Sequence, residues 1–138
     1  HIPIPLGYAH LGDAAIFLFA LLTPRRSALF AACFGSALAD FMSGFALWIL
    51  PTLVIKFVMA EIVCRMADAA SLVGRIGVAL TLSSLWMAAA YTLAGAVLYD
   101  SIAAALASFP GLFVEGVVNS ALALAALPFL RGRFLRKD

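Results

Sequence analysis

The sequence predicts an all-helical integral membrane protein, and three observations support this fold class. First, 65% of the 138 residues are hydrophobic and 12% are charged, against about 45–50% and about 25% in soluble domains. Second, the mean hydropathy of +1.10 leaves too few polar side chains to cover a water-facing surface. Third, the apolar runs are long and unbroken, whereas the strands of a membrane barrel alternate apolar and polar residues. A transmembrane helical bundle is the class that remains.

Five apolar segments divide the chain, which we take as a single transmembrane domain over residues 1–138. Each segment is compared with the roughly 20 residues that a helix needs to cross the hydrocarbon. Pro24 ends the first segment, and Pro51 begins the third in a first-turn position, where its missing N–H costs no hydrogen bond. The predicted spans are about 11–24, 27–44, 50–67, 74–98 and 111–130.

Two stretches outside the spans have patterns of their own. The opening HIPIPLGY is rich in proline, so we expect a loop there. The stretch before the last span is less apolar and ends in two residues that favour a helix start. We therefore expect a short interfacial helix at about 100–108, and then a new helix with Ser108 as its cap and Pro110 in its first turn.

The basic residues of the connections predict the orientation, because short cytoplasmic loops retain Lys and Arg. The connections near 44–50 and 99–110 contain neither residue type. This alternation places the C-terminus in the cytoplasm and, through five spans, His1 outside. An exterior start without a signal-peptide pattern leads us to expect a further helix before His1, and six spans in all. The basic residues elsewhere in the connections and tail are Arg25, Arg26, Arg65, Arg75, Arg131, Arg133, Arg136 and Lys137.

Ionisable side chains inside the spans are the strongest functional signal. Each costs about 2.5–3.5 kcal/mol at a helix centre unless it is paired or faces a cavity. In the predicted orientation, four helices place such groups in one outer layer of the bundle. Glu61 lies deeper and four residues before Arg65, which predicts an i,i+4 ion pair near the cytoplasmic end. The residues of the outer layer are Asp13, Asp40, Lys56 and Glu115, with Asn119 on the same helix face as Glu115.

A purely structural role is the alternative for several of these residues. Asp13 can cap its helix, and Asp40 with Lys56 can form an ion pair that fixes the packing of two spans. Small residues at four-residue spacing in the second span predict close helix contacts on two faces. One face carries Ala28, Ala32 and Ser36, and the other carries Ala31, Gly35 and Ala39.

Aromatic side chains gather at the same outer level, with Tyr99 closing the fourth span. Belts of Trp and Tyr are common at any membrane interface. Aromatic rings beside a few polar groups also suit a planar heterocycle, because stacking supplies affinity and hydrogen bonds supply orientation. The candidate substrate-binding residues are therefore Lys56, Glu115, Asn119, Trp48, Asp40, Tyr8, His10 and Tyr91.

The sequence gives no indication of an enzyme, a metal or a cofactor. It has no phosphate-binding loop, no H-E-x-x-H and no Cys/His cluster, and Cys33 and Cys64 stand alone in apolar spans. The net charge of +2 comes from the connections and tail. This distribution favours contact with anionic membrane lipid and does not indicate binding of nucleic acid. Energy for uphill movement must come from a partner or an ion gradient.

Several short motifs, in this order and spacing, resemble the substrate-binding S components of energy-coupling factor (ECF) vitamin transporters. The resemblance is strongest over residues 7–60 and points to the branch with riboflavin-type, hydroxymethylpyrimidine or pyridoxine substrates. The motifs are L-G-D ending at Asp13, G-S-A-L-A-D from Gly35 to Asp40, T-x-x-I-K from Thr52 to Lys56, and E-G-V-V-N from Glu115 to Asn119.

The resemblance implies a six-helix bundle with an outward-opening pocket in a bacterial cell membrane. It also implies a complex with one T transmembrane protein and two cytoplasmic ATPases. The family contacts its T protein through the first helix, which we expect to precede His1. Three carboxylates and one lysine in the outer layer disfavour an anionic vitamin, so we expect hydroxymethylpyrimidine first, pyridoxine second, and thiamine or riboflavin after them.

Two other functions stay open at this point. A small ion-coupled secondary transporter would use Glu115 or Asp40 to carry the proton. A structural scaffold for a larger membrane complex would bind no small molecule tightly.

Overall fold

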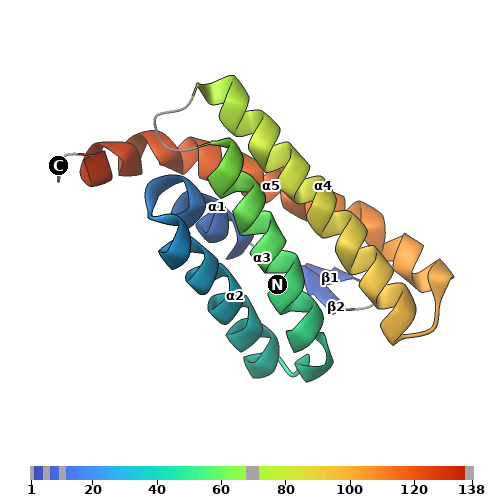
Figure 1. Cartoon of the computed structure of the whole chain (residues 1–138). Helices are drawn as coiled ribbons and strands as arrows, with labels where there is room; N and C mark the ends of the chain where they lie inside the picture. The colour runs from blue at the N-terminus through green and yellow to red at the C-terminus, as the bar shows by residue number, and fades with distance from the viewer. Residues whose placement is uncertain (1, 5–6, 10–11, 68–71, 136–138) are drawn as a thin grey trace.

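Five helices make up most of the chain in a computed structural model, which describes residues 2–4, 7–9, 12–67 and 72–135. A short 3-10 helix, η1 (Ala46–Trp48), leads directly into α3. The helix bounds are α1 Gly12–Leu22, α2 Arg25–Met42, α3 Ile49–Met66, α4 Val73–Leu98 and α5 Ile102–Leu135. Helices α2 and α4 each pack against α3, and α5 packs against α4 and α1 (Figure 1).

The two ends of the bundle differ in chemistry. Helices α2 and α4 begin, and α3 ends, at the end that carries Arg25, Arg65 and Arg75, which we name the arginine end (Figure 1). Helix α3 begins, and α4 ends, at the opposite end beside Trp48 and Tyr99, which we name the aromatic end. Consecutive helices are therefore antiparallel, as the alternation of basic connections predicts.

The first four predicted spans agree with α1 to α4 within a few residues, but the prediction for the last helix is wrong. The expected interfacial helix at 100–108 and the last span form one continuous helix, α5, with Pro110 and Pro128 inside it. Ser108 does not cap a new helix, because its hydroxyl donates to the carbonyl of Ala104 at 3.1 Å. In lipid a break would leave backbone groups without partners, so a helix that contains proline is favoured over a loop.

A small β-hairpin, where the sequence predicts a loop, precedes the helices. Strand β1 (Ile2–Ile4) pairs with β2 (Gly7–Ala9) in antiparallel register, with Ile2 opposite Ala9 and Pro3 opposite Tyr8. The hairpin contacts α5 through β2. The prediction of an all-α chain therefore holds for the bundle and fails at this short segment.

Three helical segments of the described chain are long and apolar enough to cross a membrane, namely Ala46–Met66, Val73–Leu98 and Ile102–Leu130. Helix α2 has 18 residues, but it includes Arg25, Arg26 and Asp40. Helix α1 is apolar and only 11 residues long. It packs against α2, α3 and α5, and so connects three other helices of the bundle.

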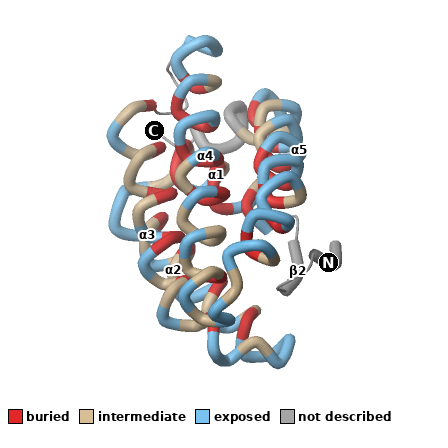
Figure 2. Tube along the Cα trace, turned by 90° about the vertical axis from the view of Figure 1, so that its right-hand side faces the viewer, coloured by how far each residue is buried: buried red, intermediate tan, exposed pale blue. Residues whose placement is uncertain are grey.

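The core forms where α1, α3 and α4 meet, around the fully buried side chains of Phe17, Met59, Met87 and Leu80. Figure 2 shows buried positions along the inward sides of the helices and exposed positions along their outer sides. Many exposed side chains are large and apolar, including Phe30 and Phe34 of α2. An outer surface of this kind suits a protein whose solvent is lipid.

Only one of the two predicted small-residue faces of α2 is packed. Ala28, Ala32 and Ser36 are buried and lie on the same side of the helix as Asp40. Gly35, on the other face, is exposed, and a Cβ added there would meet nothing within 4 Å. The buried face brings α2 against α3, which places Asp40 near the start of that helix.

Candidate functional site

A buried ion pair joins the two helices that carry the first polar groups of the outer layer. The Nζ of Lys56 on α3 lies 2.5 Å from Oδ1 of Asp13, in the first turn of α1. Lys56 is 1% exposed and Asp13 is 0% exposed. The structural alternative, in which Lys56 pairs with Asp40, is therefore wrong: Lys56 pairs with Asp13, and Asp40 accepts a hydrogen bond from Thr52.

A hydrogen-bond chain links α2, α3 and α4 beside this pair. The hydroxyl of Thr52 donates to Oδ2 of Asp40 at 2.5 Å and lies 3.0 Å from the hydroxyl of Tyr91. A carboxylate only accepts, and a hydroxyl has one proton to give. Thr52 therefore donates its hydrogen bond to Asp40 and accepts one from Tyr91. The chain of hydrogen bonds runs from Tyr91 through Thr52 to Asp40.

Tyr91 connects this chain to the ion pair and to an aromatic wall, which we define as Trp48, Tyr91 and Tyr99. The Nζ of Lys56 lies 5.2 Å from the centre of the Tyr91 ring, a cation–π distance. The Trp48 ring is 5.6 Å from Tyr91 and 6.0 Å from Tyr99, and its indole N–H donates to the Tyr99 hydroxyl at 3.0 Å. Charge, hydroxyl and ring surfaces thus meet on one side of α3.

Asn119 braces α5 against the start of α1. Its Oδ1 accepts the backbone N–H of Ala14 at 2.9 Å, and its Nδ2 donates to the carbonyl of Glu115 at 2.8 Å. Asn119 is 0% exposed and Glu115 is 4% exposed. Glu115 is within electrostatic reach of Lys56. The two α5 residues therefore lie in the same buried layer as the ion pair, as their spacing predicts.

One oxygen of this layer has no hydrogen-bond partner among the described residues. It is Oδ2 of Asp13, the carboxylate oxygen that does not contact Lys56. A buried acceptor without a donor is costly, more so when it is charged. Oδ2 of Asp13 is therefore the atom of the network that is best suited to accept a hydrogen bond from a ligand.

Six of the eight predicted site residues belong to this polar and aromatic layer, namely Lys56, Glu115, Asn119, Trp48, Asp40 and Tyr91. His10 lies outside the described residues. Tyr8 falls in β2, where only its backbone is described. The layer also contains Thr52, which the prediction leaves out although it lies four residues before Lys56 in the T-x-x-I-K motif. The i,i+4 spacing to a buried lysine is the signal that could have identified it.

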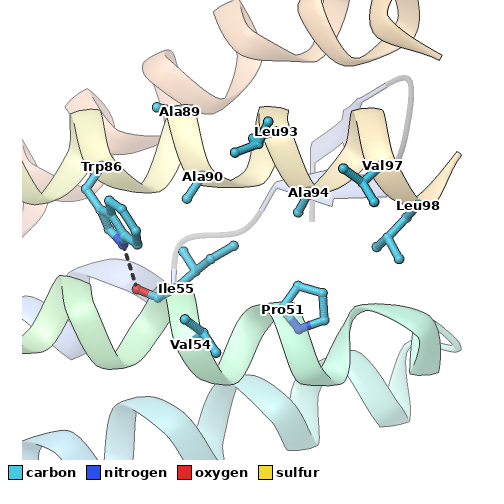
Figure 3. Close-up of a pocket in the computed structure, with 10 residues that line it drawn as sticks. All are labelled: Pro51, Val54, Ile55, Trp86, Ala89, Ala90, Leu93, Ala94, Val97 and Leu98. Carbon is cyan, nitrogen blue, oxygen red and sulfur yellow. Dashed lines mark hydrogen bonds between the residues drawn. The ribbon is translucent and has the colours of Figure 1, made fainter. Parts of the chain in front are cut away.

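An apolar groove of about 500 Å³ lies between α3 and α4 and shares no residue with the polar layer (Figure 3). Its one polar side-chain group, the indole N–H of Trp86, donates to the carbonyl of Ile55 at 3.0 Å. The groove therefore offers no group to orient a polar heterocycle, and we place the candidate site at the polar layer. The groove is lined by Pro51, Val54, Ile55, Trp86, Ala89, Ala90, Leu93, Ala94, Val97 and Leu98.

Three further polar or sulfur-containing residues of the spans make contacts outside the polar layer. Glu61 pairs with Arg65 at 2.5 Å, which confirms the predicted i,i+4 pair. Cys33 and Cys64 donate weakly to the carbonyls of Leu53 and Ala20. Within the described ranges, no three His, Cys, Asp or Glu side chains are grouped so that they could hold a metal ion.

Comparison with known proteins gives a family over nearly the whole chain. Residues 1–131 match the family model described as ECF-type riboflavin transporter, S component. A protein of Pyrococcus woesei, described as an uncharacterized protein in gap 3'region, is 37% identical over 118 residues, which cover 84% of this chain and 78% of the relative. No solved structure matches the chain.

The family description bears directly on two expectations from the sequence. It names riboflavin, which we placed behind hydroxymethylpyrimidine and pyridoxine, and it supports neither of those two. It also describes a substrate-binding subunit of a multi-pass membrane transporter. This chain therefore belongs to the family of ECF-type riboflavin transporter S components, which are vitamin-transport subunits of the cell membrane and not enzymes.

Proposed function

We propose that this chain binds a planar vitamin at the aromatic end of the bundle, with riboflavin as the first candidate. The observation that carries the proposal is the connection of a buried lysine–carboxylate pair, through Tyr91, to a wall of three aromatic rings. The rings would stack on the heterocycle, and Lys56 and Oδ2 of Asp13 would supply a donor and an acceptor. The imide edge of riboflavin offers carbonyl acceptors beside an N–H donor, which complements that pair.

Substrate rank follows from the family description and from ring size. Riboflavin comes first because the family is named for it, and because a wall of three side chains suits a three-ring heterocycle. Hydroxymethylpyrimidine and pyridoxine stay as competitors, since each combines one aromatic ring with polar groups that Lys56 and Asp13 could bind. Neither would use the whole wall.

We also propose the assembly and architecture that the family implies. The chain would act with one T transmembrane protein and two cytoplasmic ATPases, and would itself hydrolyse no ATP. The six-span bundle, with a helix before His1, stays a prediction. The arginine end would face the cytoplasm and the aromatic end the outside, in line with the rule that short cytoplasmic loops are basic.

Titration of the purified chain with riboflavin, hydroxymethylpyrimidine and pyridoxine tests the proposal. We expect riboflavin to bind most tightly, and Lys56→Ala, Asn119→Ala and Trp48→Phe each to weaken its binding by more than about threefold, which is roughly 0.65 kcal/mol. Fluorescence quenching of the flavin measures the affinity for riboflavin, competition against riboflavin measures the other two affinities, and thermal unfolding of each variant verifies that it folds.

Trp86→Phe is the matched control for Trp48→Phe. Both tryptophans donate an indole hydrogen bond, but Trp86 lies in the apolar groove and not in the aromatic wall. We expect the control to keep the affinity of the unmodified chain within about threefold. A loss of affinity at Trp86 with none at Trp48 would move the site to the groove.

A proton-coupled secondary transporter is the second candidate, and the burial of Asp40 and Glu115 within the spans is the observation in its favour. Vesicles that contain the chain alone separate the two functions. An S component without its ATPases should bind the vitamin and accumulate none. Accumulation driven by a pH gradient alone would establish the second candidate instead.

A further inference from the structure

Two arginines are held side by side on one carboxylate at the arginine end, more than one helical turn beyond Lys56 along α3. Nε and Nη2 of Arg25 donate to the two carboxylate oxygens of Glu61, at 2.8 and 2.6 Å. Nε of Arg65 donates to Oε1 of the same residue at 2.5 Å. The arrangement ties the start of α2 to the last turns of α3.

Each of these guanidinium groups has N–H donors beyond those that contact Glu61. A guanidinium has five N–H donors. Arg25 donates two hydrogen bonds to Glu61, and Arg65 donates one. The side chain of Arg25 is 52% exposed and that of Arg65 is 72% exposed, whereas that of Glu61 is 14% exposed. The carboxylate of Glu61 is thus mostly covered, and the two guanidinium groups are the part of the cluster that is accessible from outside.

Two further arginines add positive charge at this end of the bundle. Arg26 is exposed beside Arg25, and Arg75 in the first turn of α4 donates its Nε to the carbonyl of Met66 at the end of α3. Neither α2 nor α4 has an acidic residue in its first turn. The four arginines with Glu61 have a formal charge of +3 among the described residues of this end; Asp68 lies outside the described residues.

We propose that this arginine cluster, defined as Arg25 and Arg65 paired with Glu61 and Arg26 and Arg75 at the same end of the bundle, binds the phosphate of an anionic phospholipid headgroup. Paired guanidinium groups match the oxygens of a phosphate through parallel hydrogen bonds, which an ammonium group cannot reproduce. The cluster lies at the ends of membrane helices, where headgroups are at high local concentration and where anionic lipids attract basic residues. Glu61 acts as a positioning residue, because it fixes the distance between two of the cations.

Lipid retention by the full chain tests the proposal, with phosphatidylglycerol as the anionic probe and phosphatidylcholine as the neutral one. In detergent titrations followed by native mass spectrometry, we expect the unmodified chain to bind phosphatidylglycerol at least about tenfold more tightly. The double variant Arg25→Lys/Arg65→Lys keeps the net charge and removes the guanidinium forks. We expect it to lose most of that preference, and Arg25→Gln/Arg65→Gln to lose all of it.

A charge-matched control separates a built site from general attraction. Arg136→Gln/Lys137→Gln removes two positive charges from the tail, and we expect it to retain the preference within about twofold. Equal losses in the tail variant and in Arg25→Gln/Arg65→Gln would overturn the proposal, as would unchanged binding by the lysine variant. Displacement of the lipid by millimolar inorganic phosphate would show that the cluster serves a soluble anion, and would overturn the assignment to lipid. Thermal unfolding verifies that each variant is folded.

Discussion

Thr52 shows how a single hydroxyl can organise this site. It is 1% exposed and contacts both the carboxylate of Asp40 and the hydroxyl of Tyr91. Both partners would lose this hydrogen bond if the hydroxyl were removed without a change of shape. A buried polar group left unsatisfied costs about 1–3 kcal/mol.

Thr52→Val should therefore lower the free energy of unfolding by about 1–3 kcal/mol and weaken vitamin binding, because Tyr91 loses the contact that orients its ring. Denaturant unfolding in detergent measures the stability. Thr81→Val is the matched control, since Thr81 is exposed and bonds only to the carbonyl of Gly77 in its own helix. Equal effects of the two substitutions would contradict the special role of Thr52.

The buried lysine illustrates a limit of arguments from residue type. The sequence correctly places Lys56 and the carboxylates in one layer, because depth along a helix follows from position in the chain. It does not identify the partner, since Asp13 and Asp40 are at similar depth on different helices. The choice of Asp13 depends on how far α1 enters the bundle, which is a property of packing.

At the scale of the elements, the crossing of α4 and α5 depends on one glycine. A Cβ added at Gly116 would lie 2.7 Å from the Cβ of Ser84, closer than real Cβ atoms approach one another. The hydroxyl of Ser84 also bridges the helices through the carbonyl of Gly116 at 3.3 Å and the hydroxyl of Ser120 at 3.2 Å. Close approach of small residues is how helices associate in lipid.

Gly116→Ala should separate α4 from α5 and destabilise the bundle by about 1–3 kcal/mol, the usual cost of overpacking. Gly77→Ala is the control, because a Cβ there meets nothing within 4 Å and alanine favours the helix. The double variant Gly116→Ala/Ser84→Gly should recover part of the loss by removing the opposing Cβ. Unfolding measurements that find Gly116→Ala as harmless as Gly77→Ala would contradict the packing argument.

Pro51 and Pro110 occupy different positions in their helices. At Pro51, the expectation of a first-turn proline is confirmed, since α3 begins at Ile49. At Pro110, the same rule predicts a helix start that does not occur, because α5 runs through it. The local pattern is alike at both sites, and the need to satisfy backbone groups in an apolar setting decides the second.

At the scale of the molecule, the separation of arginines from aromatic and buried polar residues gives the bundle a direction. The arginine cluster is at one end, and the vitamin-site candidates lie toward the other. The basic end of a membrane protein is retained in the cytoplasm. The orientation can therefore be tested without knowledge of the substrate.

A reporter enzyme fused after Asp138 should be active in the cytoplasm, and one inserted between α2 and α3 at Gly44 should be active outside. Gly44 is a suitable position because it is in a turn with positive φ between the two helices, away from the core. Paired cytoplasmic and exterior reporters measure the side at each position. Exterior activity of the C-terminal fusion would reverse the proposed orientation and place the vitamin site on the wrong side for uptake.

The sequence by itself determined the class of the protein, the approximate position of four of its helices, and the residues that form the buried polar layer. These properties follow from hydropathy and from the cost of charge in lipid, which act on each segment independently. Only the tertiary structure decided that Lys56 pairs with Asp13, that Thr52 links Asp40 to Tyr91, and that Arg25 shares Glu61 with Arg65. Each of these contacts joins different helices, and the rotation and depth of one helix against another depend on side-chain packing across the whole bundle.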